Sequence, residues 1–125
     1  MNTTQRTGAP GHAETAAEAV RALNHATIWP GPDGYQEPAD VDAVLGHLAT
    51  LAAYLPQALD QAERWLYEAL DAHQVRHDQG ADVAHSVHYV AVCLGDARDR
   101  SRDLHELLRE AREHSSHLAS GGETR

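Results

Sequence analysis

Histidine is the residue type in this chain whose number and spacing best fit a chemical role. Ten of the 125 residues are histidines, and His73 and His77 lie four residues apart, while His85 and His88 lie three apart. Side chains at these spacings share one face of a helix, so each pair could bind a divalent metal such as zinc. His85 and His88 lie off the apolar positions of their predicted helix, so hydrogen-bonded or solvated histidines at a helix tip are the alternative.

A fifth histidine belongs to the segment VDAVLGHLATLAAYL, in which His47 follows a Val-Leu pair. This segment resembles the metal-binding helix of the DinB-like, mycothiol-dependent metalloenzymes. The resemblance implies that His47 is one metal ligand and that His73 and His77 are the others, with His85 or His88 as a further candidate. The chain is shorter than that family's members, and its HxxxH pair lies much closer to the first histidine.

Motifs of other enzyme classes are missing from the sequence. It contains no Gly-rich phosphate loop, HExxH, GxSxG or CxxC, and no Glu-x-x-His for a di-iron bundle. The single Cys93 excludes an internal disulfide. No signal peptide or membrane-length apolar run is present. We therefore predict a cytoplasmic protein that is not an enzyme and has no cofactor, with the metal site as the alternative.

Three helices are predicted from capping signals and apolar periodicity. The first runs from the capping-box spacing of Thr15 and Glu18 to about residue 26. The second starts at Pro38 and Asp40 and continues to about residue 70. It contains Pro56, which removes a backbone hydrogen bond and predicts a kink or a break. Gly80 and Asp82 favour a turn before a third helix.

The third helix carries the most regular apolar pattern in the chain. Steps of four and three residues are typical of a coiled-coil-like seam, and they connect Val83, Val87, Val90, Leu94, Ala97, Ser101, Leu104, Leu108, Ala111, Ser115 and Leu118. The predicted fold is all-α: a long antiparallel helical hairpin plus a short N-terminal helix. We expect a single domain over residues 14–118, with disordered tails at 1–13 and 119–125.

A lone hairpin of this kind leaves apolar surface uncovered, so we expect a helical bundle completed by oligomerisation, with a homodimer as the first expectation. The alternative is that a break at Pro56 lets the chain fold back as a monomeric four-helix bundle. Ala-rich contacts contribute little burial per residue, which also favours a second chain.

Charge is distributed unevenly along the chain. The formal net charge is -9, and residues 1–82, with twelve acids and four arginines, account for -8 of it. Such a surface repels nucleic acid and anionic membranes. We therefore expect a protein partner with a basic or apolar surface, or, more narrowly, acidic mimicry of nucleic acid. The predicted partner-binding residues are Trp29, Tyr35, Asp40, Asp42, Asp60 and Glu63.

The segment TIWPGPDGYQEPAD, residues 27–40, connects the first two predicted helices. Its prolines and glycines fit a connector, and we expect Trp29 to fold back as a buried lid over the hairpin. Trp29 with Gly31 resembles the W-x-G turn of helical-hairpin proteins exported by type VII secretion, and Tyr67 with Asp71 resembles their export signal. Here, however, only a short helix precedes the turn.

The whole chain resembles, in style and composition, small uncharacterised helical proteins encoded in actinobacterial genomes, which implies no activity. The leading hypothesis is a non-enzymatic interaction or regulatory protein, a helical oligomer with an acidic surface that binds a protein partner. The alternative is a metal-binding enzyme or sensor that uses the histidines. A small-ligand pocket lined by Trp65, Tyr67 or Tyr89 stays open, although core or interface packing is the simpler role for Trp65.

Overall fold

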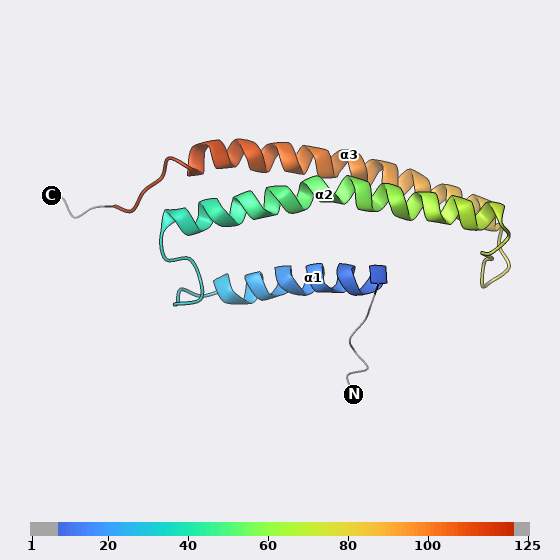
Figure 1. Cartoon of the computed structure of the whole chain (residues 1–125), viewed down its shortest axis with the longest axis horizontal. Coiled ribbons are helices and arrows are strands. Elements are labelled where there is room, and N and C mark those ends of the chain that lie inside the picture. Colours follow the sequence, from blue (N-terminus) through green and yellow to red (C-terminus); the bar gives the residue numbers. More distant parts are fainter. Residues whose placement is uncertain (1–7, 122–125) are drawn as a thin grey trace, which may run out of the picture. The chain divides into compact units, whose positions relative to one another are not determined.

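The computed structural model describes residues 8–121 and contains three helices, shown in Figure 1: α1 (Gly8–Thr27), α2 (Pro38–Asp71) and α3 (Val83–Ser115). No strand occurs within these residues, so the predicted all-α class is confirmed. The chain divides into two compact units. One contains α1 and the segment to Asp40, together with residues from 119 onward. The other spans Val41–Leu118, and the two are described separately.

The first unit contains a longer helix than the sequence signals indicated. α1 begins at Gly8, so residues 8–13, which were predicted to belong to a disordered tail, are helical; residues 1–7 lie outside the described part. Gly8 has a positive φ of 74°, and Pro10 lies in the first turn, where its missing amide hydrogen is harmless. Thr15 and Glu18 therefore lie inside the helix, and Glu18 pairs with Arg21 at 3.6 Å.

The segment after α1 is a structured turn. The amide of Gly34 donates to the carbonyl of Gly31 at 3.1 Å, and a Cβ on Gly34 would lie 2.9 Å from the carbonyl oxygen of Ala26. The Asp40 carboxylate accepts hydrogen bonds from the amides of Gln36 and Glu37, at 2.8 and 3.2 Å. These contacts confirm the connector, but the predicted burial of Trp29 is wrong, because 73% of its surface is exposed. The turn directs the chain without covering the indole.

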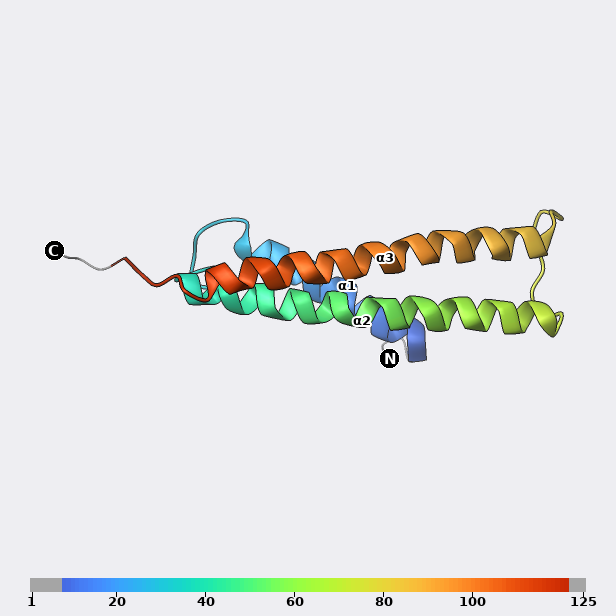
Figure 2. The same cartoon turned by 90° about the horizontal axis from the view of Figure 1, so that it is seen from above.

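α2 runs unbroken from Pro38 to Asp71, with Pro56 inside it. A break at Pro56 is therefore wrong, and with it the route to a monomeric four-helix bundle. Proline at this point removes the bond from residue 56 to the carbonyl of Ala52. The apolar pattern keeps its phase across the proline, and α3 lies along α2, as both Figure 1 and Figure 2 show.

The turn between α2 and α3 has the cap and the left-handed glycine that the sequence predicts. Asp82 caps α3, because its side chain accepts hydrogen bonds from the amides of Ala84 at 3.0 Å and His85 at 3.4 Å. Gly80 has a φ of 80°, as its predicted left-handed position requires. His73 also has a positive φ, of 58°, directly after the end of α2.

The core between α2 and α3 is built from small side chains. Ala49, Ala52, Ala69 and Val87 are the buried apolar residues of the described chain, and Ser101 and Ser115 are buried as well. A Cβ on Gly46 would lie 2.9 Å from Cζ of Arg112, so the absence of a side chain at Gly46 makes room for that guanidinium. The hairpin thus has close helix contacts but a thin apolar interior.

Candidate interaction surface

Polar contacts connect α2 to α3 along their shared interface. Arg98 Nη1 donates to Glu63 Oε1 at 2.7 Å, and His105 Nδ1 donates to the backbone carbonyl of Ala49 at 2.8 Å. Near the other end of the hairpin, Asp42 accepts hydrogen bonds from Arg112 Nη2 at 3.3 Å and from Ser115 Oγ at 2.7 Å. We call this set of contacts the polar seam. Its α3 members Arg98, His105 and Arg112 are seven residues apart, so they share one face of the helix.

The polar seam also sets the ionisation of two of its members. The hydroxyl of Ser115 first, and then Arg112, lower the pKa of Asp42 below its ordinary value, although partial burial opposes this shift. The hydrogen bond from Arg98 to Glu63 raises the pKa of the guanidinium. Both shifts favour the charged form of the group, the carboxylate of Asp42 and the guanidinium of Arg98.

These contacts change the expected role of the acidic residues. The side chains of Asp42 and Glu63 are only 19% and 24% exposed, and both are bound by α3. Asp40 holds the turn before α2, and Asp60 pairs with Arg64 at 3.0 Å. The structure thus engages within the chain all four acids that the sequence predicted as partner contacts. The aromatic candidates Trp29 and Tyr35 are exposed and lie in the other unit.

The candidate metal ligands do not come together. His47 lies within α2, and 26 residues separate it from His73, which corresponds to roughly 39 Å along a helix. His73 and His77 follow the end of α2 and so share no helix face. His77 Nδ1 instead accepts the amide hydrogen of Gln79 at 3.0 Å. Within residues 8–121, no three His, Cys, Asp or Glu side chains form a group able to hold a metal.

The remaining histidines of the hairpin tip lie at the start of α3. His85 and His88 are exposed, and the hydroxyl of Tyr67 lies 3.5 Å from Nδ1 of His88. This arrangement matches the hydrogen-bonded histidines that the sequence allowed as the alternative to a metal site.

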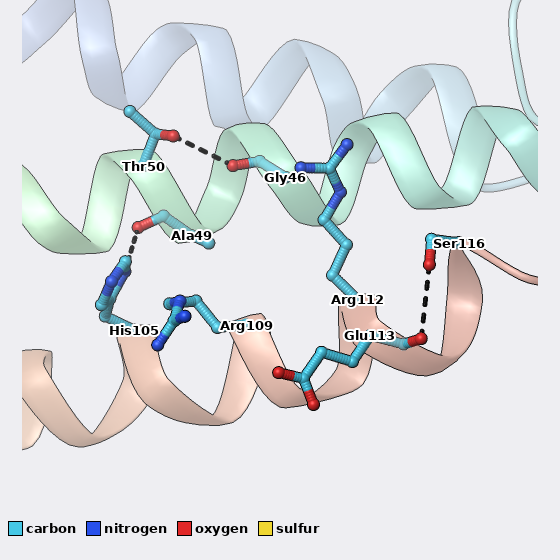
Figure 3. Close-up of a pocket in the computed structure, with 8 residues that line it drawn as sticks. All are labelled: Gly46, Ala49, Thr50, His105, Arg109, Arg112, Glu113 and Ser116. Carbon is cyan, nitrogen blue, oxygen red and sulfur yellow. Dashed lines mark hydrogen bonds between the residues drawn. The ribbon is translucent and has the colours of Figure 1, made fainter.

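A shallow groove lies beside the polar seam, between α2 and α3 (Figure 3). Its larger pocket has a volume of about 430 Å³, and a neighbouring one of about 290 Å³ shares His105 with it. In Figure 3 Arg112 of α3 reaches toward α2, where the pocket is bordered by Gly46, Ala49 and Thr50. The groove contains charges of both signs, and Arg112 is already paired with Asp42.

Neither pocket has the features of a catalytic or aromatic ligand site. In the described residues, no hydrogen bond joins a serine, threonine or cysteine side chain to a histidine, which is the pairing that activates a nucleophile. Trp65 and Tyr89 are 61% and 65% exposed and line neither pocket. Trp65 is therefore not core packing.

The predicted heptad of α3 is only half correct. One set of its positions faces α2, namely Val87, Leu94, Ser101, Leu108 and Ser115, which are buried or half-buried. Of the other set, Val90, Leu104, Ala111 and Leu118 are exposed. Arg98 and His105 take the inner places instead, because hydrogen bonds to α2 compensate their partial burial.

Exposed residues of α3, with the half-buried Ala97 among them, form a second regular pattern. Steps of three and four residues connect Val90, Cys93, Ala97, Arg100, Leu104, Leu107 and Ala111, a set that we call the α3 strip. Leu104 and Leu107 are 46% and 62% exposed, and Cys93 is exposed too. Three members of the strip, Val90, Leu104 and Leu107, are large apolar side chains that are exposed, and exposed apolar side chains gathered on one face are a feature of interaction sites.

Sequence reasoning missed the α3 strip as a site, although its signal is present. The spacing of Leu104 and Leu107 is that of a seam, but Leu104 was assigned to the interface with α2. Arg98, His105 and Arg112 recur every seven residues. Polar residues that occupy the face toward α2 in this way leave Leu104 and Leu107 on a different face of the helix.

No helix of residues 8–121 is long and apolar enough to cross a membrane.

The chain matches no protein-family model, no curated protein and no solved structure.

Proposed function

We propose that this is a non-enzymatic protein-interaction protein, and that the α3 strip binds a helix of another protein molecule. The observation that carries the proposal is the exposure of Leu104 and Leu107, two leucines on one face of a helix whose other face is already bound by α2. Burying such side chains stabilises a complex by about 1.5–3 kcal/mol each when burial is complete.

The rest of the hairpin fits this role. The polar seam and the small buried residues fix α3 against α2 without using the leucines of the strip. A preorganised helix loses little conformational entropy when it binds, which favours affinity. The metal-binding alternative receives no such support, because His47 lies far from the other predicted ligands and no group of three possible ligands occurs within residues 8–121.

A photo-crosslinking amino acid at Leu107 tests the proposal in the native cell. Insertion at Gln61, an exposed α2 position, is the control. We expect a covalent protein adduct from position 107 and none from position 61, and we expect Leu104→Glu to remove the adduct while the urea midpoint stays unchanged. Equal labelling at both positions, or no adduct at 107, would contradict the proposal.

A further inference from the structure

A row of unpaired carboxylates borders the α3 strip. Asp96, Asp103 and Glu110 are seven residues apart, and each lies three or four residues from members of the strip, so all three lie along the same edge. Within the described residues none of them has a hydrogen bond or an ion pair.

Nearby acids of the same helix behave differently. Asp99 accepts from Arg102 at 3.3 Å, and Glu106 accepts from Arg109 at 3.2 Å. Cations of α3 therefore neutralise part of its acidic surface, but they leave the edge of the strip uncompensated. These free carboxylates would lie beside a bound helix, and Arg100 of the strip lies between Asp96 and Asp103.

This edge has the spacing of the flanking positions of a helix pair. Positions seven residues apart recur about every 10.5 Å along a helix, and charged residues at the flanks of an apolar seam select the partner and its register. Three carboxylates at this spacing match a partner helix with Arg or Lys every seven residues beside its own apolar stripe. Complementary charge of this kind contributes chiefly to specificity and association rate.

A second copy of this chain fits the same edge poorly. Antiparallel pairing of two strips would bring Asp103 beside Asp103 of the other copy and Asp96 beside Glu110. In parallel pairing the acids would lie beside Ser101, Leu108 and Ser115 of the other copy, which already face α2. Two strips together hold six of these carboxylates and two copies of Arg100. Each chain also has a net charge of -9. Like charges beside an apolar seam disfavour pairing.

We infer that the α3 strip binds an amphipathic helix of a different protein, one whose apolar stripe is bordered by Arg or Lys residues. The inference rests on the proposed function and names the partner's chemistry. The homodimer predicted from the sequence would then have to use another face.

Designed peptides test this inference on the full-length protein. The probe is a peptide of about 28 residues, four heptads with Leu at the seam and Lys at the flanks. One control peptide has Glu at the flanks, and another is a scramble of the Lys peptide. Fluorescence anisotropy measures the dissociation constants. We expect the Lys-flanked peptide to bind at least roughly tenfold tighter than either control, and its affinity to fall with added salt.

Variants of the protein distinguish the effect of the three edge carboxylates on affinity from the effect of the protein's net charge. The triple variant D96N/D103N/E110Q should weaken binding of the Lys-flanked peptide roughly tenfold or more, as expected for the loss of three exposed ion pairs. A matched variant, D33N/E68Q/D71N, removes three exposed acids elsewhere and should change the affinity less than about twofold. Circular dichroism and urea unfolding check that both variants are folded.

Three results of the peptide experiments would overturn the inference. They are equal weakening by the two triple variants, binding of the Glu-flanked peptide as tight as that of the Lys-flanked one, and failure of the Lys-flanked peptide to bind. A dimer in sedimentation that L104E/L107E converts to a monomer would identify a second copy as the occupant, which also overturns it. The proposed function would survive each of these results if Leu107 still crosslinks in cells, and it fails separately if no adduct forms.

Discussion

Polar and apolar side chains are distributed unusually between the two faces of α3. The face toward α2 holds Arg98 and His105 beside small or half-buried residues, whereas Leu104 and Leu107 lie on the α3 strip outside. In most surface helices the large apolar side chains face the core. The difference indicates that directional bonds help to hold the hairpin, and that Leu104 and Leu107 are available for another contact.

The difference also has a physical basis in the size of the interior. Ala49 and Ala52 are small and buried, and the leucines of α3 that face α2, Leu94 and Leu108, are only half-buried. Arginine and histidine reach across from the side of the interface, where the charged or polar group stays near water while its stem is partly covered. Both the polar seam and the α3 strip therefore repeat every seven residues, each on its own face of α3.

The largest expected effect on the free energy of unfolding is the difference between alanine substitutions at two adjacent leucines. Leu108 is half-buried against α2, whereas Leu107 is on the α3 strip. Leu108→Ala should lower the free energy of unfolding by about 2 kcal/mol, and Leu107→Ala by less than about 0.5 kcal/mol. Urea unfolding of both variants at equal protein concentration measures the difference. Equal losses would mean that the two faces are not distinct.

A smaller effect should follow from removing one directional bond of the polar seam. His105→Leu keeps similar volume but cannot donate to the Ala49 carbonyl, so we expect a loss of about 1 kcal/mol in the free energy of unfolding. His114→Leu, at an exposed position of α3, should have almost no effect. Nitrogen NMR of the His105 ring in the unmodified protein should show the hydrogen on Nδ1. A ring protonated only at Nε2 would contradict the assigned contact.

The smallest effect should be a pH-dependent one at Asp42. Its pKa is lower in the folded state than its ordinary value of 3.8, so the unfolded chain takes up this proton first as the pH falls. The stabilisation is therefore fully present above the unfolded value and is lost as the pH falls through the folded one.

Asp42→Asn keeps the acceptor for Ser115 but removes the charge, so the stability gap to the unmodified protein should close in acid. Urea titrations between pH 7 and pH 2.5 measure it, and Ser115→Ala should behave in the same direction. A gap that stays constant over this range would show that the charge of Asp42 does not stabilise the fold.

The sequence predicted what depends on local signals. The cap at Asp82, the left-handed Gly80 and the long helical runs of α2 and α3 follow from backbone chemistry within a few residues. The start of α1 was missed because a helix that begins at Gly8 shows no side-chain capping signal in its first turn.

The assignment of faces could not be predicted in the same way. α3 carries two apolar rows, and hydropathy favours Leu104 over Arg98 for the interior. The choice between them depends on how closely α2 approaches and on acceptors such as Glu63 and the Ala49 carbonyl, which come from distant parts of the chain. The exposure of Trp29 was missed for a related reason, since turn residues predict a reversal but not what the reversal covers.

Pro56 gives the hairpin a mechanical property. The Ala52 carbonyl lacks the helical amide that any other residue at 56 would supply, so α2 is weakest against bending at this point. α3 contains no proline, and it is bonded to α2 on both sides of it, at Asp42 and Ala49 on one side and at Glu63 on the other. Bending α2 at Pro56 would strain all of these hydrogen bonds at once, so α3 supports α2 against bending. Because α3 resists bending there, the carboxylates along its edge keep a constant spacing.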